Sequence, residues 1–528
     1  MIGKEFPLCL IRKVAGRPDD ELERMLRELQ LAEFIYEQPT VSDVEYNFKH
    51  ALTREVAYGS VLSDRRAELH RRIAAAIESL YGEKLEDHYG ELAHHYGRAS
   101  ETAKAVHYLG LAGEQASARS AYAEALEHLT TGLELLRKLP EGAARDREEL
   151  KIQLALGFAS YVVNGAASNE AEAAFSRAYE LCRRGGESPD LVSALFGLTR
   201  MHLTRGVVHK AREASHEILE VAGRIQHPVS LTIAHYAMGM ALMFQAELTL
   251  ARERLEQALG LYESVPELSG LRHRPVGALL VLGRILWLLG CPDQALKRTR
   301  EAELAGRRSA DTLEKNFGLN LTQDVHVWCG NFDAVRERAQ TLLDAPWATA
   351  VNSTFLTRAE ILRGWLLARE GQLQGIALIR DAMARRASIR SGLYRSMNGS
   401  LLAEACASLG RIDEAMTALD EALTFAEAEE HYYEAELHRL RGKLLLMRTD
   451  ANREGAERCF RKAIDIARRQ SAKSWELRAT VSLSRLLRET GRRDEARTML
   501  ADTYGWFHEG FDTNDLKEAK ALLDELES

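Results

Sequence analysis

The sequence predicts an all-α fold: a right-handed α-solenoid of about ten degenerate helix pairs, preceded by a small module with one β-hairpin. Two observations lead to this prediction. A triplet of small and apolar residues recurs about every forty residues through most of the 528-residue chain, and the first eighty or so residues lack it. A repeat that cannot bury its own apolar face must stack on its neighbours, so the triplets predict one continuous superhelix.

Each triplet has its second member four positions after the first and its third member three positions later. Since these positions share one face of a helix, each triplet predicts the packed face of the second helix of a pair. First members from residue 171 onward are separated by 40, 40, 44, 40, 41, 39, 41 and 40 residues. The clearer copies are Ala105/Leu109/Ala112, Ala171/Phe175/Ala178, Ala251/Leu255/Ala258, Ala415/Leu419/Ala422 and Ala456/Phe460/Ala463; the weaker ones are Ala211/Ser215/Ile218, Ala295/Thr299/Ala302, Val335/Ala339/Leu342, Ile376/Arg380/Met383 and Ala496/Leu500/Thr503.

A glycine stands five residues before several triplets, and an aspartate follows it. The segments are Gly290-Cys-Pro-Asp-Gln-Ala295, Gly410-Arg-Ile-Asp-Glu-Ala415 and Gly491-Arg-Arg-Asp-Glu-Ala496. Glycine tolerates the left-handed conformation that ends a helix, so it predicts the end of the first helix of each pair. The aspartate predicts a cap on the free N–H groups of the next helix.

The first eighty or so residues follow another pattern. Apolar residues at helical spacing after Pro18 predict a helix over Asp19 to Ala32. Two strand-like runs, Phe34 to Tyr36 and Val44 to Phe48, predict a hairpin. Helices are expected again over residues 49–62 and 64–80.

Charge and composition exclude some classes of partner. The net charge of −8 and the pI near 6.1 make a nucleic acid partner improbable on electrostatic grounds. The most apolar window, Val276 to Gly290, contains Arg284 and is too short for a membrane span. Six scattered cysteines without a CxxC pair are typical of reduced, buried thiols. We therefore expect a cytoplasmic protein that does not associate with a membrane.

In their second helices the repeats resemble the tetratricopeptide family. The family pattern of alanine, a large residue at +4 and alanine at +7 is matched by Ala456/Phe460/Ala463. The pitch of about forty residues exceeds the family value of about thirty-four, so each helix is expected to be longer by nearly a turn.

A second resemblance covers the N-terminal part most closely. The chain resembles the winged-helix and repeat regions of bacterial signalling ATPases of the STAND type, in particular those fused to class III adenylate/guanylate cyclases. This resemblance implies a regulatory winged-helix module over residues 1–82 and a tetratricopeptide-like superhelix over residues 83–528. The segments that carry it are Ile2 to Phe6, Ile35 to Gln38, Tyr46 to Tyr58, Arg65 to Ile73, Glu91 to Tyr96 and Lys104 to Leu109.

Catalytic motifs of that family do not occur in the sequence. No GxxxxGK[ST] phosphate loop, Walker B strand or set of cyclase carboxylates is present. We therefore expect no enzymatic activity and no cofactor, and a signal-sensing region whose superhelix binds a protein or peptide and which regulates a P-loop ATPase or cyclase module in cis or in trans. The alternatives are a fragment of a cyclase or ATPase with catalytic domains upstream, a transcription regulator of the ATPase-plus-repeat type, and a plain assembly scaffold.

The segment Phe48-Lys49-His50-Ala51-Leu52 resembles the motif that follows the wing in the wider class of signalling ATPases. The resemblance implies that His50, with Lys49 beside it, contacts the β-phosphate of ADP bound to an ATPase module. An imidazole at a helix N-terminus is suited to this, because the helix dipole also favours an anion. Ala51 stands where many members have an acid, and simple packing of His50 between wing and helix is the alternative.

Clusters of arginine and of histidine also occur in the N-terminal part of the chain. Arg65, Arg66, Arg71 and Arg72 predict a basic surface, either solvated or in contact with the partner module, although interleaved acids argue against DNA. His88, His94 and His95 lack further ligands at metal-binding spacing, so packing is expected and no metal site.

The superhelix also contains candidates for ligand contact. Trp347 with Arg358, Arg363 and Arg385 would suit an acidic peptide if they faced a concave groove. Trp287 and Trp365 stand at apolar helix positions and predict core residues.

Overall fold

The computed structural model describes residues 1–3, 5–39, 44–165, 167–264, 276–309, 311–345, 353–448 and 452–527. Its residue contacts divide the chain into two compact units, Met1–Ala159 and Ser160–Ser528. They are called here the N-terminal unit and the repeat unit, and each is described by itself. The sequence predicts a division between residues 82 and 83, where the local pattern changes from the N-terminal module to the repeat array. The two compact units are defined by residue contacts and do not test that division, so it stays a prediction.

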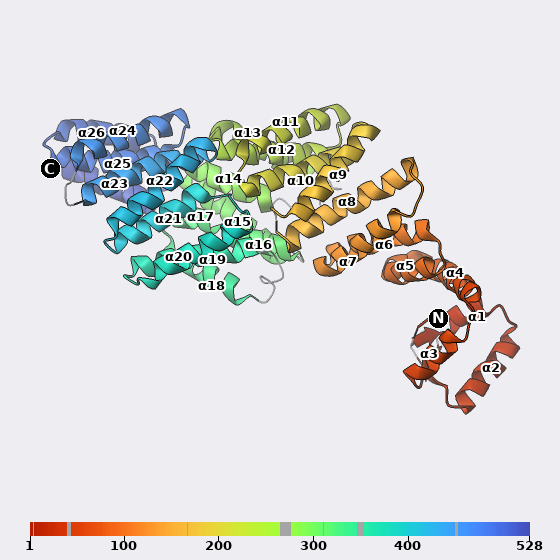
Figure 1. The fold of residues 1–528 in the computed structure, drawn as a ribbon. Helices are drawn as coiled ribbons and strands as arrows, with labels where there is room; N and C mark the ends of the chain where they lie inside the picture. The colour runs from red at the N-terminus through yellow and green to blue at the C-terminus, as the bar shows by residue number, and fades with distance from the viewer. Residues whose placement is uncertain are drawn as a thin grey trace. The chain divides into compact units, whose positions relative to one another are not determined.

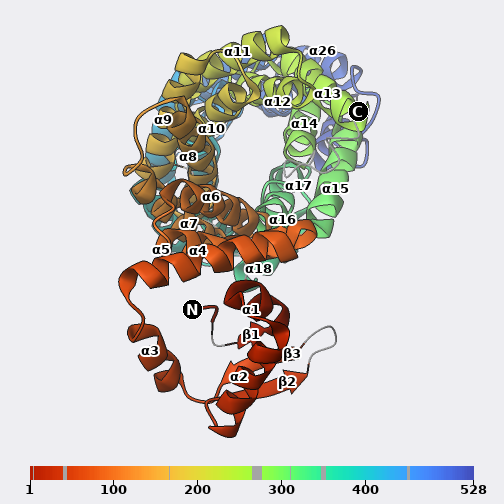
Figure 2. The same ribbon diagram turned by 90° about the vertical axis from the view of Figure 1, so that its right-hand side faces the viewer.

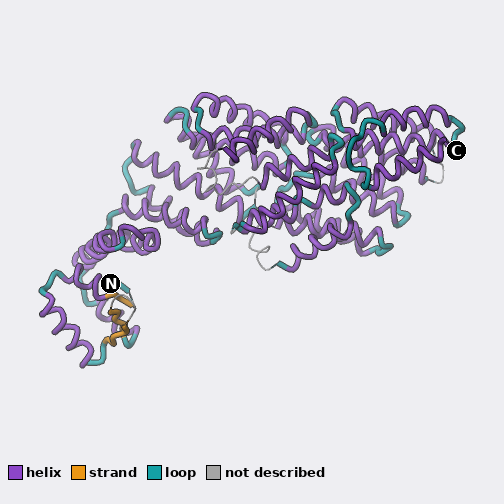
Figure 3. Tube along the Cα trace, turned by 180° about the vertical axis from the view of Figure 1, so that it is seen from behind, coloured by secondary structure: helices purple, strands orange, loops and turns teal. Residues whose placement is uncertain are grey.

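The N-terminal unit contains a three-stranded antiparallel sheet (Figure 3). Its strands are β1 (Glu5–Pro7), β2 (Ile35–Pro39) and β3 (Val44–Phe48), in the order β1-β3-β2. Ile35 lies opposite Phe48, and Phe6 lies opposite Tyr46. The predicted hairpin is thus confirmed, whereas the short edge strand β1 was not predicted, since three residues show no alternation.

The helices of the N-terminal unit follow the predicted order closely. Leu10 and Val14 of α1 pack with Ile73 and Ile77 of α4, and this cluster continues into α5 and α6. The helices are α1 (Leu8–Ala15), α2 (Asp19–Leu31), α3 (Ala51–Gly59), α4 (Ser63–Leu80), the 3₁₀ segment η1 (Gly82–His88), α5 (Tyr89–Arg98), α6 (Thr102–Ala118), α7 (Tyr122–Leu136) and α8 (Ala143–Val163), whose last residues belong to the repeat unit.

The repeat unit is built from antiparallel helix pairs (Figure 1). Its helices are α9 (Asn169–Gly185), α10 (Pro189–Arg205), α11 (Val208–Ile225), α12 (Pro228–Phe244), α13 (Leu248–Ser264), α14 (Val276–Leu288), α15 (Pro292–Arg308), α16 (Thr312–Asn320), α17 (Gln323–Trp328), α18 (Phe332–Asp344), α19 (Ser353–Arg369), α20 (Gln374–Ser388), α21 (Arg395–Ser408), α22 (Ile412–Ala428), η4 (His431–Tyr433), α23 (Glu434–Met447), α24 (Arg453–Arg469), α25 (Lys473–Glu489), α26 (Arg493–Tyr504) and α27 (Asn514–Glu527). The chain is therefore a tetratricopeptide-like α-solenoid, as predicted.

The predicted triplets lie on the packed faces of second helices. In α24, Ala456, Phe460 and Ala463 are all buried. One triplet departs from the pattern: in α20 Arg380 is exposed, and the buried residues are Gly375, Ile376, Ile379, Ala382 and Arg386. A further copy, Ala125/Leu129/Gly132, is buried in α7 and was missed.

The turn prediction is half right. Gly290, Gly410 and Gly491 have φ of +88°, +75° and +81°, so each takes the left-handed conformation that ends a first helix. The aspartates do not cap the following helices. The N-cap residues of α15, α22 and α26 are Cys291, Arg411 and Arg492, without a side-chain cap, and the aspartates lie in the first turn.

The repeat unit winds so that distant helices become neighbours. Figure 2 looks along the winding, with α10, α12 and α14 on the inner side and α11, α13 and α15 outside them. Helices α14 and α25 are in contact although almost two hundred residues separate them. One hydrophobic cluster extends from Leu203 to Trp475 and includes Trp287 and Trp365, which confirms both as core residues.

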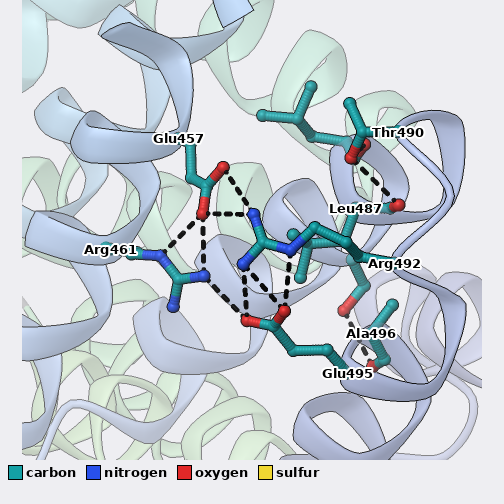
Figure 4. Close-up of polar contacts among 9 residues, drawn as sticks. Glu457, Arg461, Leu487, Thr490, Arg492, Glu495 and Ala496 are labelled. Carbon is teal, nitrogen blue, oxygen red and sulfur yellow. Dashed lines mark hydrogen bonds and ion pairs between the residues drawn. The ribbon is translucent and has the colours of Figure 1, made fainter. Parts of the chain in front are cut away.

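On the surface, ion pairs connect successive repeats. Figure 4 shows Arg461 of α24 between Glu457 and Glu495, with Arg492 bonded to the same two acids at 2.8 to 3.0 Å. Arginine–glutamate pairs 34 residues apart recur along the unit, at Arg336–Glu370 and Arg380–Glu414. In the part of the chain that the structure describes, no helix is both long enough and apolar enough to cross a membrane.

Candidate ligand-binding site and docking surface

Hydrogen bonds join two successive turns of the repeat unit along what we call the seam. On one side the seam consists of Thr204, Val208, His209, Asp293 and Gln294, and on the other side of Gly392, Leu393, Glu429, Glu509 and Gly510. The backbone amides of Gly392 and Leu393 donate to the Thr204 carbonyl at 2.8 and 3.0 Å. The seam closes the superhelix on itself at this level.

Two glutamates of the seam cap helix N-termini across it. Glu429 accepts from the amides of Val208 and His209, at the start of α11, at 2.7 and 3.2 Å. Glu509 accepts from the amides of Asp293 and Gln294, at the start of α15, at 3.0 Å each. At α15 the carboxylate of Glu509 takes the place of the cap expected from Asp293, whereas no aspartate cap was predicted at α11. Both glutamates come from 215 to 221 residues along the chain.

A cluster of buried charged residues lies beside the seam. Asp324 of α17 accepts from both Arg284 of α14, at 2.6 Å, and Arg358 of α19. The exposed fractions of these three side chains are only 1 or 2%. Arg284 also donates to the hydroxyl of Tyr394, and Arg358 donates to the side-chain oxygen of Asn398.

Two further charged groups complete the cluster. Glu430 is fully buried and accepts from the amides of Tyr394 and Ser396. Burial raises its pKa to about 7, against the opposing effect of these hydrogen bonds. Burial, together with the charge of Arg358, lowers the pKa of Arg386 to about 10. Among the described residues, the cluster thus brings Arg284, Arg358 and Arg386 together with Asp324 and Glu430, and Arg386 donates to the Leu393 carbonyl at 2.9 Å.

A cavity of about 90 Å³ opens beside this cluster. Its apolar wall consists of Leu313, Phe317, Leu321, Phe355 and Leu393. Its polar wall consists of Asn320, Arg358, Arg386, Ser391 and Tyr394, and Tyr161, Val162 and Thr204 close it from the preceding turn. The buried atoms Asn320 Oδ1, Ser391 Oγ and Arg358 Nε have no hydrogen-bond partner among the described residues. The cavity thus combines an apolar surface with unused donors and acceptors.

A second, larger cavity of about 390 Å³ lies on α23, α25 and α27. Its charged residues are already paired: Arg439 with Glu436, Arg478 with Asp515, and Arg485 with Glu518. Lys443 is the exception, because no acid among the described residues pairs with it. The charge of neighbouring Arg439, followed by burial, lowers its pKa.

The N-terminal unit exposes an apolar groove of about 360 Å³ between α2, α3 and the sheet. Helix α3 has no buried residue, and the exposed fractions of Leu52 and Val56 are 69% and 64%. Met25 and Leu29 of α2 are also exposed, at 43% and 41%. Large exposed apolar surfaces are typical of sites that bind another molecule.

The residues predicted to sense nucleotide lie at the edge of this groove. His50 is exposed and is the N-cap residue of α3. Lys49 is exposed and forms an ion pair with Glu33 at 2.7 Å. His50 therefore stands at a helix N-terminus, as the prediction requires, and its role stays a prediction.

The four arginines of α4 have different surroundings. Arg71 pairs with Glu68 and Glu101, and Arg66 lies over the ring of Tyr58. The Arg72 guanidinium lies near Gly16, and Arg65 is exposed. Their common role as a contact surface stays a prediction.

Buried histidines form a chain that was not foreseen. His70 of α4 and His95 of α5 share a 2.8 Å contact between their Nδ1 atoms, and the Tyr58 hydroxyl lies 3.2 Å from His70 Nε2. Burial, with the neighbouring His95 and His94, lowers the pKa of His70 to about 4. His88 stacks on Tyr81 with 4.1 Å between the ring centroids, and His94 is exposed. These contacts connect α3, α4 and α5.

The predicted groove residues that the structure describes differ in their burial, and their common contact with a ligand stays a prediction. Arg358 belongs to the buried cluster and borders the cavity. Arg385 is exposed and pairs with Glu360 and Asp381, and Arg363 is exposed. Trp347 lies outside the described residues.

Among the described residues, Glu427, Glu434 and His438 have ligand atoms close enough together to suggest a metal site. His438 Nε2 lies 3.8 and 3.9 Å from the two carboxylates, wider than the roughly 3.4 Å between ligands of a tetrahedral zinc ion. Lys462 lies 3.5 Å from Glu427 and neutralises it. Burial lowers the pKa of His438 to about 4, so the imidazole is neutral near pH 7, and the ion pair here is the one between Lys462 and Glu427.

Sequence reasoning missed the main residues of the cluster, although one signal was available. Arg284 is the single charge in an apolar window, and a buried arginine needs an acidic partner. Neither Asp324 nor Glu430 could be assigned as that partner, because the superhelix sets their proximity. No local sequence pattern marks Glu429 and Glu509 as caps of distant helices.

Comparison with known proteins gives limited matches. No family model matches the chain. The uncharacterized protein R02095 of Rhizobium meliloti (strain 1021) is 33% identical over 139 residues, which are 26% of this chain. The match spans only 14% of that relative's length.

Three solved structures have helical arrangements similar to that of this chain. The apo form of the quorum sensor NprR from B. thuringiensis has a TM-score of 0.42 at 14% identity, over 68% of this chain and 99% of that one. The human IFIT1 dimer with m7Gppp-AAAA has a TM-score of 0.41 at 16% identity, over 80% and 90%. Yeast Tom70 has a TM-score of 0.34 at 12% identity, over 90% and 96%. At these values we draw nothing from them about ligands or partners.

Proposed function

We propose that this chain is a non-enzymatic sensing region. Its repeat unit binds a protein, a peptide or a small signal molecule, and its N-terminal unit acts as a winged-helix module that relays occupancy to a P-loop ATPase or cyclase module in cis or in trans. The partner module follows from the family resemblance of the sequence. The apolar groove supports docking, because Met25 and Leu29 line it and are exposed at 43% and 41%, and Leu52 and Val56 of neighbouring α3 are exposed as well.

The observation that carries the proposal is the seam. Two turns of the repeat unit are held by a small number of hydrogen bonds around a cavity. A ligand that prefers the closed or the open arrangement shifts the balance between them by its difference in affinity. A rotation of a degree or two per repeat then adds up along the superhelix.

A ligand-free experiment tests the relay. In the variant Glu429→Gln with Glu509→Gln, both caps across the seam lose their charge, and the amides at the starts of α11 and α15 should exchange hydrogen faster. If the N-terminal unit responds to the state of the repeat unit, exchange in residues 44–80 should change as well.

The control for this experiment is Glu457→Gln with Glu495→Gln, which removes two surface carboxylates of the α24–α26 ion pairs (Figure 4). The control should leave residues 44–80 unchanged. Unchanged exchange there in the seam variant too would overturn the relay and favour a plain assembly scaffold.

The nucleotide role of His50 is tested when a P-loop ATPase module is supplied with the chain. The variant His50→Ala should weaken ADP binding by that complex, and Lys49→Ala, which also removes the exposed pair with Glu33, shows whether Lys49 shares this role. Equal ADP affinity of His50→Ala and the natural chain would contradict the role.

Two of the alternative functions can each be tested by one experiment. A fragment of a cyclase or ATPase would be joined in frame to catalytic modules, which sequencing upstream of Met1 detects. A transcription regulator would shift duplex DNA in a gel, with an affinity that falls steeply with salt.

A further inference from the structure

The groove of the N-terminal unit is an open apolar surface beside α3. It is lined by Phe6, Ile35 and Phe48 from the three strands and by Met25 and Leu29 from α2. Helix α3 stands apart from α1 and α2 (Figure 2), and the element that it contacts most is β3. Nothing within the unit therefore covers the groove between α2 and α3.

One charged side chain, Arg54 of α3, lines this apolar groove. It is half-buried, and among the described residues no acid pairs with it. Arg71 of α4 differs, since it pairs with both Glu68 and Glu101. A molecule that covers the groove buries the Arg54 guanidinium further, which is strongly unfavourable unless that molecule brings a counter-charge. The occupant that fits the groove therefore carries an acidic group.

The lining favours a helix over an extended segment. Apart from Arg54 and Tyr58, every lining residue is apolar or glycine, so the lining side chains offer few partners to a bound backbone. A helix bonds its own backbone groups internally, whereas an extended segment would bury N–H and C=O groups without partners. Since a cavity of about 150 Å³ holds benzene, the groove of about 360 Å³ takes two or three apolar side chains. Large side chains at i, i+4 and i+7 of one helix face supply that number.

An anionic membrane surface is the other partner that combines apolar groups with negative charge. The charge of the predicted module argues against it, because residues 1–82 contain 12 Lys and Arg against 14 Asp and Glu. Helix α2, which borders the groove, begins with the exposed acids Asp19 and Asp20. A membrane close to the groove would meet this negative charge. The charge balance therefore favours a protein partner.

From these features we propose that the groove binds an amphipathic helix of a partner module. The helix presents two or three large apolar side chains on one face and, beside them, an acidic residue that pairs with Arg54. Met25 and Leu29 recognise the apolar face, and Arg54 recognises the charge. The proposal rests on the proposed docking of the N-terminal unit on another module and names the chemistry of the docking segment.

A short peptide of this pattern is the probe: acetyl-Ser-Leu-Glu-Ala-Ala-Leu-Ala-Lys-Leu-Glu-Ala-Ala-Ala-Lys-Ala-amide, called here the glutamate peptide. Its leucines lie at i, i+4 and i+7, and its glutamates flank their face. The glutamine peptide has glutamine in place of both glutamates, and the alanine peptide has alanine in place of the leucines. Binding to the full chain is measured by fluorescence anisotropy of the labelled peptides.

The glutamate peptide should bind about tenfold more tightly than the glutamine peptide, because hydrogen bonds between charged groups are stronger than neutral ones. The alanine peptide should not bind, since it leaves the apolar lining uncovered.

Matched variants assign the binding to the groove. Arg54→Gln should weaken binding of the glutamate peptide about tenfold and leave that of the glutamine peptide unchanged. Arg24→Gln, which removes an exposed arginine of α2 outside the lining, should change neither. Leu29→Asn should abolish binding, whereas Leu31→Asn, at an exposed leucine of the same helix outside the lining, should not.

A charge exchange keeps the test valid if Arg54→Gln disturbs α3. Arg54→Glu should reject the glutamate peptide and should bind a peptide with lysine in place of its two glutamates. Binding that follows the charge at this position in both directions cannot come from a loss of folding.

The proposal is overturned if the glutamine peptide binds as tightly as the glutamate peptide, if neither binds, or if Arg24→Gln weakens binding as much as Arg54→Gln. It is also overturned if the full chain binds vesicles of phosphatidylserine and phosphatidylcholine, or dimerises in analytical ultracentrifugation, and Leu29→Asn but not Leu31→Asn abolishes this. The groove then serves a membrane or a second copy. If the proposal fails while the seam variant still alters exchange in residues 44–80, the sensing function stands and only the chemistry of the docking segment is wrong.

Discussion

At the scale of single residues, the charged cluster around Asp324 is the least expected part of this molecule. Arg284 and Arg358 are almost completely buried, and one carboxylate serves both. Ionised groups at such depth are tolerated only when they are paired and hydrogen-bonded. Loss of the shared acid therefore has a larger effect than loss of an ordinary ion pair.

The variant Asp324→Ala tests this. It leaves two buried guanidiniums without an acid and should lower the free energy of unfolding by about 3–5 kcal/mol. Urea unfolding followed by tryptophan fluorescence measures the loss, because Trp287, Trp328 and Trp475 are packed together nearby. Glu370→Ala, at the exposed pair with Arg336, should cost less than about 1 kcal/mol. Comparable losses of unfolding free energy in the two variants would show that the buried acid Asp324 is no more important for stability than the acid of an exposed ion pair.

The raised pKa of Glu430 gives a pH dependence with a definite sign. The folded state binds this proton more tightly than the unfolded state, so the stabilisation is present below the ordinary pKa of 4.5 and is lost as the pH rises through about 7. In Glu430→Gln the group cannot titrate. The stability of the natural chain relative to this variant should fall between about pH 4.5 and 7 in urea unfolding at a series of pH values, and a constant difference would argue against it.

His70 has the opposite sign. Its pKa of about 4 lies below the ordinary value of 6.5, so its stabilisation is present above pH 6.5 and is lost as the pH falls towards 4. The protection factors of the amides in α4 and α5, which are their exchange rates corrected for the intrinsic rate at each pH, should therefore fall over this range. In His70→Gln the fall should be smaller, and an identical fall in the variant would assign it to other groups.

At the scale of helices and turns, local sequence was enough wherever a feature depends on nearest neighbours. The triplet Ala456/Phe460/Ala463 and the glycine before Ala415 predicted a packed face and a helix end correctly. The aspartate caps predicted at α15, α22 and α26 were wrong. At α15 the first amides bond instead to Glu509 from another turn of the superhelix, and α22 and α26 begin without a side-chain cap. No local pattern encodes a contact over more than two hundred residues.

Two glycines with the same backbone conformation show how a turn differs from the seam: Gly410 lies in a turn, and Gly206 lies against Gly392 at the seam. Gly410 and Gly206 both have φ of +75°, but a Cβ on Gly410 would meet no atom, whereas on Gly206 it would lie 2.9 Å from the Gly392 carbonyl. Gly410→Ala should cost about 1–2 kcal/mol for the left-handed conformation alone. Gly206→Ala should cost more and should speed hydrogen exchange at the Gly392 and Leu393 amides. Equal stabilities in urea unfolding would contradict this difference.

At the scale of the whole molecule, the repeat unit departs from the usual behaviour of a solenoid. In an open array each repeat contacts only its neighbours, so stability is close to a sum of local contributions. Here the seam and the contact between α14 and α25 connect repeats that are far apart in the chain. The candidate cavity could not have been predicted for the same reason, since Thr204 and Leu393 meet only after the chain has wound once.

This connection predicts one cooperative unfolding transition for the repeat unit. In the natural chain, hydrogen exchange in α10 to α12 and tryptophan fluorescence from the later repeats should give the same midpoint in urea. In Glu429→Gln with Glu509→Gln the two midpoints should separate, because the turns then open independently. A common midpoint in both proteins would mean that the apolar contacts alone couple the turns.

The closed winding also has a consequence for synthesis on the ribosome. Helices α10 to α15 leave the ribosome well before Gly392, Glu429 and Glu509 exist, so the nascent first turn has neither its caps nor the backbone partner of Thr204. Long-range contacts of this kind form late and slowly. The inner surface of the growing chain therefore stays uncovered until the last repeats emerge, and this interval is when chaperones have access to it.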